Sequence, residues 1–189
     1  MRSLLLVLWL MLVMPASGQL PEMFDPATAP KTWVEDLRMM MRNGRMESGL
    51  RDTLSKIHEF AKRGRKIRIT KEHEFSAFST SRGILAFRRG ISEEPERSKE
   101  VWYDSILIGV HASKDEPPPL PFHVESRIGE IRLFARVTKD LPPMKPLNEY
   151  EESYFGEKCM AYEYGAGHWI TRLFVRNDRV IAISFGLEP

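Results

Sequence analysis

Two apolar runs close to the C-terminus constrain the fold more than any other feature. Residues 168–175 and 179–185 alternate regularly, and each run carries apolar side chains on both faces. The Asn177-Asp178 pair between them tolerates the left-handed backbone of a tight turn. A strand that is apolar on both faces is typical of the interior of a sheet with cover on each side. We therefore expect a C-terminal β-hairpin buried within a sheet.

Upstream segments indicate that this hairpin belongs to a largely antiparallel sheet. Apolar residues recur at every second position, and turn residues such as Ser81-Arg82-Gly83 separate two of the segments. Period-two alternation bounded by turn residues is the signature of strands. The predicted strands are 67–70, 75–80, 84–88 and 101–112.

Residues 124–138 fit two secondary structures. Their apolar residues match a helical spacing and also a strand alternation. Gly129 lies in the middle and costs a helix about 1 kcal/mol. Because the alternation is also the more regular pattern, we predict a strand.

Capping signals predict helices before and between the strands. Residues 32–43 begin with a capping box, and residues 50–61 carry apolar residues at helical spacing before Gly64. Both helices are apolar on one face, so both should pack on the sheet. Another capping box, at 148–151, predicts a short helix that ends at Gly156. The expected fold class is α+β: an N-terminal helix pair packed on a largely antiparallel sheet, with a C-terminal β-hairpin.

The first eighteen residues resemble a secretory signal peptide. One arginine precedes eleven apolar residues at 4–14, and small residues Ala16 and Gly18 follow. Eleven helical residues span about 16 Å, roughly half of a hydrocarbon core, which is too short for a membrane anchor. We expect cleavage after Gly18, a secreted or periplasmic location and no transmembrane segment in the mature chain. Residues 19–30, which contain three prolines, form an extended lead-in to a single domain at 31–189.

Charge and cysteine content exclude several classes of protein. The 189 residues carry a formal charge of +2, so no strong field favours nucleic acid as a partner. A single cysteine, Cys159, excludes an intramolecular disulfide framework and a cysteine-based zinc ribbon. We expect Cys159 to be buried within a strand.

Motifs that carry catalysis or cofactor binding are missing from the sequence. It contains no nucleophile elbow, no phosphate-binding Walker loop and no His-Glu-x-x-His zinc motif. Gly165-Ala166-Gly167 lacks the third glycine of a dinucleotide fingerprint and reads as a hairpin turn. The five histidines form no short-range ligand pair. We therefore expect no catalytic residue, no metal site and no cofactor.

One face of the strand at 101–112 is a candidate wall of a ligand groove. Its odd positions mix aromatic, polar and glycine residues, a combination that suits a groove, although a covered sheet face would look the same. The candidate groove residues are Tyr103, Ser105, His111 and Trp169.

Six positive charges within ten residues form a candidate anion-binding patch. They follow the predicted second helix, where cations also complement the helix dipole, by roughly 0.3–1 kcal/mol each. The patch consists of Lys62, Arg63, Arg65, Lys66, Arg68 and Lys71. Arg82, Arg88 and Arg89 could extend it, and an acidic run at 93–96 could neutralise it.

These observations leave two main hypotheses about function, and a third, a structural partner in a complex, which an exposed apolar patch larger than a few hundred Å² would mark. The leading hypothesis is an exported, soluble, non-enzymatic protein that binds an envelope component, such as an anionic polymer, or a protein partner. The alternative is a small hydrolase acting on an extracellular polymer, with Tyr103, Asp104 and His111 as candidate groups. An acid–base pair within hydrogen-bonding distance would favour the hydrolase, whereas a contiguous basic or aromatic surface would favour the binding protein.

Overall fold

A computed structural model provides the structure of this chain. It divides the chain into two units, 1–30 and 31–189, and all the described residues belong to the second unit. The predicted signal peptide and lead-in therefore lie outside the described residues. The described residues are 35, 37–39, 41–42, 58–90, 102–114, 116–137, 145–166 and 169–187.

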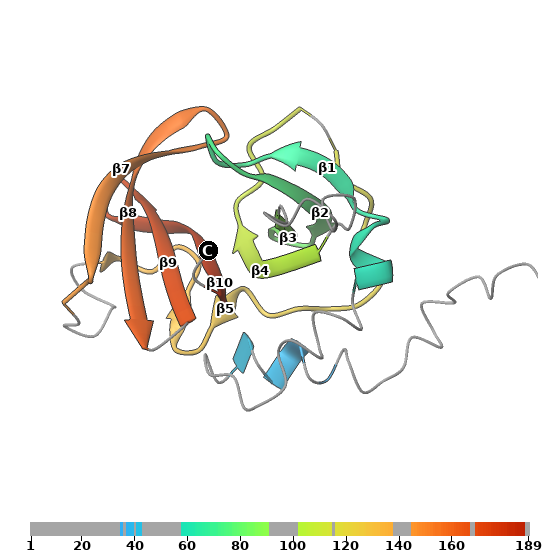
Figure 1. Ribbon diagram of the computed structural model, residues 1–189, viewed down its shortest axis with the longest axis horizontal. Helices are drawn as coiled ribbons and strands as arrows, with labels where there is room; N and C mark the ends of the chain where they lie inside the picture. The colour runs from blue at the N-terminus through green and yellow to red at the C-terminus, as the bar shows by residue number, and fades with distance from the viewer. Residues whose placement is uncertain are drawn as a thin grey trace, which may run out of the picture. The chain divides into compact units, whose positions relative to one another are not determined.

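One eight-stranded antiparallel sheet organises the second unit (Figure 1). Its strand order is β1-β2-β3-β4-β10-β9-β8-β7, so two four-stranded meanders join where β4 pairs with β10. The first meander contains β1 (Arg65–Arg68), β2 (Glu74–Thr80), β3 (Gly83–Gly90) and β4 (Trp102–Gly109). The second contains β7 (Asn148–Tyr154), β8 (Glu157–Ala166), β9 (Trp169–Arg176) and β10 (Arg179–Leu187). A separate small hairpin pairs β5 (Arg127–Ile128) with β6 (Ile131–Arg132).

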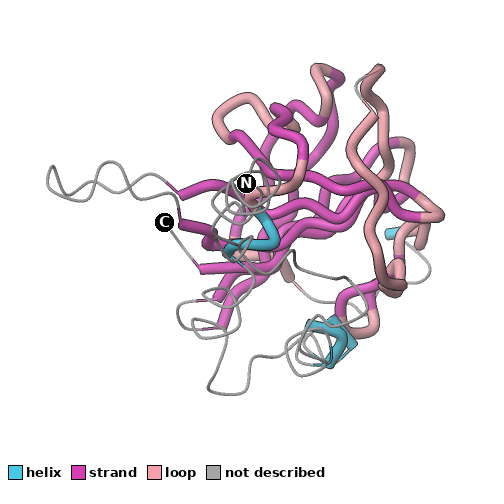
Figure 2. Tube along the Cα trace, turned by 90° about the vertical axis from the view of Figure 1, so that its right-hand side faces the viewer, coloured by secondary structure: helices cyan, strands magenta, loops and turns pink. Residues whose placement is uncertain are grey.

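The predicted α+β class is wrong, because strand dominates the described residues (Figure 2). The described helical residues lie mainly within 35–42 and 58–61, which is too little for a helix layer covering the sheet. The segment at 148–151 shows why a capping signal predicted a helix incorrectly. It matches a capping box but forms β7, which pairs with β8 along its whole length. A capping signal is local, and pairing with a neighbouring strand overrides it.

Residues 124–138 do not form the single strand that alternation predicts. They form the β5–β6 hairpin, in which each strand has two residues. Gly129 lies in the turn with a φ of 59°, a backbone region that glycine enters without steric cost. Its N–H donates to the carbonyl oxygen of Met41 at 2.6 Å, which joins this hairpin to the helical residues at 35–42.

The C-terminal hairpin predicted from alternation is present as β9 and β10. Asn177 and Asp178 form its turn with φ values of 51° and 60°, as the two-residue turns of twisted hairpins require. Phe174 and Ile183 are both almost fully buried, one on each strand. Both strands are interior strands of the sheet, since β9 also pairs with β8 and β10 with β4.

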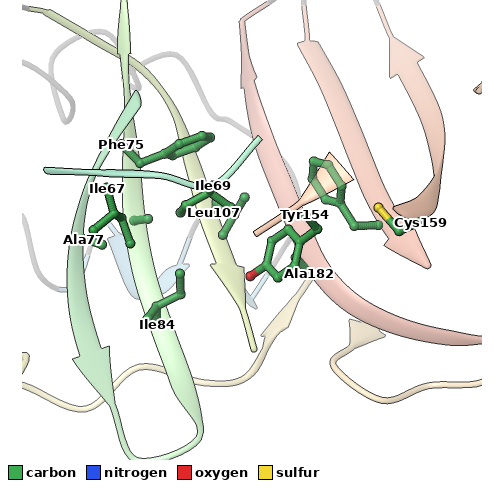
Figure 3. Close-up of a cluster of buried hydrophobic side chains, with 11 residues drawn as sticks. Ile67, Ile69, Phe75, Ala77, Ile84, Leu107, Tyr154, Cys159 and Ala182 are labelled. Carbon is green, nitrogen blue, oxygen red and sulfur yellow. The ribbon is translucent and has the colours of Figure 1, made fainter. Parts of the chain in front are cut away.

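The sheet is curled, so that side chains from both meanders share one core on its inner face. Figure 3 shows Tyr154 and Cys159 from the second meander opposite Ile67 and Phe75 from the first. The curl also brings the ends of the two edge strands together, because Phe155, just after β7, donates its N–H to the carbonyl oxygen of Ile69 at 2.8 Å. The buried cluster comprises Ile67, Ile69, Phe75, Ala77, Ile84, Ala86, Leu107, Tyr154, Cys159, Phe174 and Ala182.

On the outer face, the end of a helix covers the first meander. The Phe60 ring stacks on Phe78 with centroids 4.4 Å apart, and Ser76 donates its hydroxyl to the carbonyl oxygen of Ala61. This packing fixes where β1 begins, four residues after Ala61. Among the described residues, no helix is long and apolar enough to cross a membrane.

A proline-rich segment covers part of the edge that β1 leaves open. β1 pairs with residues 74–77 of β2, and beyond it Ser79 donates to the carbonyl oxygen of Pro118 while Leu120 donates back to Ser79, both at 2.8 Å. Prolines are typical of protected sheet edges because they lack an N–H. Within the described residues, no strand pairs with the outer edge of β1, which ends the sheet on this side.

Candidate functional site

The six cations of the predicted patch lie on or beside the edge strand β1, and all six are exposed. Ile67 is their buried neighbour and anchors β1 in the core, since it is only 6% exposed. Alternation therefore turns Lys66 and Arg68 to the outer face while Ile67 faces inward. We call this surface the basic edge; it consists of Lys62, Arg63, Arg65, Lys66, Arg68 and Lys71.

Ion pairs within the described residues neutralise only part of the basic edge. Lys62 pairs with Glu59 at 2.6 Å, an exposed pair worth little to stability. Glu74 lies opposite Arg68 in the β1–β2 ladder, but its carboxylate pairs with Arg89 instead. Lys66, Arg68 and Lys71 have no carboxylate partner among the described residues. The basic edge thus includes three exposed cations without a carboxylate partner in the described part of the chain, and it lies on a strand at the end of the sheet.

The residues expected to extend or neutralise the basic edge have other roles or positions. Arg88 is buried and pairs with Asp104, so it adds no surface charge. Arg89 is paired with Glu74, and Arg82 lies in the turn between β2 and β3. The acidic run at 93–96 lies outside the described residues.

A β-bulge divides the candidate groove residues between the two faces of the sheet. Ser105 pairs with Arg88, but Tyr103 pairs with Arg89, so β4 has one more residue than β3 at this point. The additional residue is Asp104, and a bulge of this kind changes the alternation of side chains along the strand. Tyr103 and Ser105, although two residues apart, therefore face opposite sides.

Their contacts agree with this division. Tyr103 lies on the outer face against His58 and Phe87, with ring centroids 5.6 and 6.2 Å away, and burial raises its pKa. Ser105 lies on the inner face, where its neighbour across the ladder is Gly186. A Cβ at position 186 would collide with the Cβ of Ser105, so this close approach requires glycine.

The other two groove candidates lie elsewhere. His111 follows the far end of β4 and contacts the ring of Phe155 at 5.9 Å. Trp169 begins β9, where it pairs with Leu187 and Ala166. Gly109 lies six positions after Tyr103 along β4, a distance of roughly 20 Å. Tyr103 and His111 are thus at opposite ends of the strand, and the candidate groups of the hydrolase hypothesis have separate environments.

Sequence reasoning missed a polar network on the inner face of the sheet. The bulge turns Asp104 toward Arg88, whose Nε donates to its carboxylate at 2.6 Å, and both side chains are less than a tenth exposed. Ser105 is adjacent, and its buried hydroxyl has no hydrogen-bond partner among the described residues. A bulge is set by strand pairing, so no local sequence signal could have revealed this ion pair.

The second part of the network surrounds Glu163 on β8. Its carboxylate accepts hydrogen bonds from Arg172 at 2.5 and 2.8 Å, from the Tyr150 hydroxyl at 2.9 Å and from Asn148 at 2.9 Å. Burial raises the pKa of Glu163, but these hydrogen bonds outweigh it and the net pKa is lowered. Because every oxygen is satisfied within the network, it resembles a structural cross-link more than a reactive site.

His73 connects the two parts electrostatically. Burial lowers its pKa, and the positive charges of Arg88 and Arg172 lower it further against the opposing effect of Asp104. The ring is therefore neutral at pH 7, and it is half-buried. A neutral histidine beside charges that already have partners offers no nucleophile–base pair.

The described residues provide little for metal or thiol chemistry. They contain no group of three or more His, Cys, Asp or Glu side chains that could hold a metal ion. Cys159 is buried in β8, as predicted, and burial raises the pKa of its thiol to about 11. Its thiol therefore stays protonated at neutral pH, unlike a catalytic cysteine.

Comparison with known proteins adds no functional information, since no family model, curated protein or solved structure matches the chain. Function is therefore inferred from the residues and their geometry. Lys66, Arg68 and Lys71 of the basic edge carry charges without a carboxylate partner among the described residues, whereas the inner network satisfies most of its own groups. The basic edge is thus the candidate functional site.

Proposed function

We propose that the protein is an exported, non-enzymatic binding protein, and that its basic edge binds an anionic polymer of the cell envelope. Export is supported by the signal-like pattern of residues 1–18. Binding is supported by the position of the exposed cations on and beside β1, the strand at the end of the sheet. The chemistry that recognises the polymer is a row of ammonium and guanidinium groups facing repeated carboxylates or phosphates.

The observation that carries the proposal is the exposure of six cations within ten residues, three of them without a carboxylate partner among the described residues. Two unit charges about 7 Å apart in water repel by about 0.6 kcal/mol. Lys66 and Arg68 lie on one face at this spacing, as alternate residues of a strand do. The negative charges of a polyanion at a similar spacing would attract both side chains and offset the repulsion between them.

The test compares polymer binding by two variants with equal changes in charge. Fluorescence anisotropy with labelled polygalacturonate measures affinity at low ionic strength, and neutral dextran is the negative control. The first variant reverses Lys66, Arg68 and Lys71 to Glu. The second reverses Arg82, Lys114 and Arg132, which are also exposed, so net charge falls equally.

We expect the basic-edge variant to lose at least tenfold in affinity and the control variant about twofold. Binding should weaken further as salt is added, since exposed charges are screened beyond about 8 Å at physiological ionic strength. Equal losses in the two variants would show that only net charge matters. Absence of polygalacturonate binding by the unmodified protein would reject this class of polymer.

A further inference from the structure

We infer that the basic edge has a second occupant: the acidic edge strand β7 of another copy of this chain. The inference goes beyond the proposed function, with which it shares β1. It rests on the opposite charges of the two edge strands and on the way their faces and directions match.

The edge at the other end of the sheet is acidic. β7 contains Glu149, Glu151 and Glu152 and no positive residue. Glu149 and Glu151 are exposed, and Glu151 pairs with Lys158 of β8 at 2.7 Å, an ion pair in which both side chains are largely in solvent. Such a pair is weak enough to exchange partners. β1 and β7 are therefore a cationic and an anionic edge of one sheet.

The charges lie on the same face of both strands. Ile67 of β1 and Tyr154 of β7 both point into the inner core, so the residues that alternate with them point outward. On β1 these outward residues include Lys66 and Arg68. On β7 they include Glu149 and Glu151, with the same two-residue spacing. If β7 of a second copy extended the sheet at β1, these two pairs would meet on the outer face.

Strand direction also permits this pairing. Every neighbouring pair in the eight-stranded sheet is antiparallel, so the first and last strands run in opposite directions. β7 of a second copy placed beside β1 would therefore continue the antiparallel order. Pairing would satisfy the outward N–H and C=O groups of both strands in addition to the charges.

Charge favours the pairing of β1 with β7 over the pairing of β1 with β1 or of β7 with β7. Charged residues on an edge ordinarily prevent association because like charges repel when two copies of one strand meet. That protection holds for β1 against β1 and for β7 against β7, but it fails for β1 against β7. Among the described residues of one copy, the Phe155–Ile69 hydrogen bond joins the two edges at the ends of the strands. In this described part of the chain no strand pairs with the outer edge of β1 or of β7, so each edge can receive a second copy, and a polyanion on β1 would compete with that copy.

Sedimentation velocity on the full chain tests the inference at about 10 mM ionic strength, where screening is weak, and at about 1 M, where the screening length is about 3 Å. We expect reversible association at low salt that is lost at high salt. One variant carries Lys66→Glu with Arg68→Glu, and another carries Glu149→Lys with Glu151→Lys. Matched controls are Arg82→Glu with Lys114→Glu, and Glu116→Lys with Glu130→Lys, all at exposed positions.

Each edge variant alone should be monomeric, whereas its matched control should associate like the unmodified protein. Mixing the two edge variants should restore association, because one then has two acidic edges and the other two basic edges. The fourfold variant with both swaps should associate by itself. Because mixing requires both proteins to be folded, restoration also excludes misfolding as the reason for the monomers.

A monomeric unmodified protein at low salt, or edge variants that associate as well as their controls, would overturn the inference. The β7 variant separates this outcome from failure of the proposed function. It leaves the basic edge intact and adds positive charge, so it should bind polygalacturonate at least as tightly as the unmodified protein while failing to self-associate.

Discussion

The backbone N–H of Phe155 donates to the carbonyl oxygen of Ile69 at 2.8 Å, which ties the end of β7 to the residue after β1. Phe155 is the first residue of the two-residue turn between β7 and β8, and this turn gives it a φ of 52°, a left-handed conformation that is unusual for an aromatic residue. Its ring packs against Tyr154 and His111, with centroids 5.0 and 5.9 Å away. Packing thus holds a strained backbone at the point where the curled sheet joins its own edges.

This strain predicts that Phe155→Gly is more stable than Phe155→Ala, the reverse of the usual order for these two residues. Phe155→Ala and Phe155→Gly lose the same ring contacts, but only glycine relieves the left-handed backbone, which costs other residues roughly 1–2 kcal/mol. We expect the alanine variant to lose about 2 kcal/mol of unfolding free energy and the glycine variant about 1 kcal/mol less. Urea denaturation measures both. A glycine variant less stable than the alanine variant would contradict this explanation.

Removing one member of the buried pair Arg88–Asp104 should lower the unfolding free energy strongly, whereas replacing both residues should lower it less. Asp104→Asn leaves a buried guanidinium without its counter-charge, and we expect a loss of about 3–5 kcal/mol in unfolding free energy. Replacing both residues, Arg88→Met with Asp104→Leu, removes both charges and should cost clearly less than either single change. A double-mutant cycle by urea denaturation measures the coupling. Additive losses would mean that the two side chains do not act as a pair.

Glu163 should make stability depend on acid pH. Its folded-state pKa is lowered, so the folded state favours the carboxylate. Its contribution is complete above the unfolded value of about 4.3 and is lost as pH falls through the lower folded pKa. We expect the unfolding free energy of the unmodified protein to fall more steeply below about pH 5 than that of Glu163→Gln. Parallel curves for the two proteins would exclude this contribution.

Cys159 should react slowly in the folded protein. With a pKa of about 11, roughly one thiol in ten thousand is ionised at pH 7, and the side chain is buried. Labelling with a disulfide reagent should take hours in buffer and seconds in 8 M urea, on the order of a thousandfold faster. Rapid labelling of the native protein would show that β8 opens readily or that the thiol is accessible.

Part of the fold could be predicted from the sequence because some signals are local. The hairpin at Asn177-Asp178 follows from alternation and turn residues, and the strand at 101–112 appears as β4. The helix expected at 148–151 is wrong because a capping box describes four residues, whereas seven residues of β7 pair with β8. The pairing of β4 with β10 joins residues more than seventy positions apart, and nothing local encodes it.

The candidate site also depends on long-range strand pairing that local sequence signals do not encode. The cluster of cations near 62–71 was visible by counting, but its position on an edge strand depends on the sheet order. Strict alternation placed Tyr103 and Ser105 on one face, and the bulge at Asp104 separates them. The network around Glu163 joins three strands, so its members are scattered in the sequence and match no motif.

If the basic edge is the binding surface, hydrogen–deuterium exchange with and without polygalacturonate should detect the polymer on β1. No strand in the described part of the chain pairs with the outer edge of β1, so backbone N–H groups on that edge should exchange readily unless a ligand covers them. We predict slower exchange in peptides covering residues 62–71 when the polymer is present, and no change there with neutral dextran. Protection confined to other peptides, or no protection at 62–71 under conditions where the polymer is bound, would contradict the account.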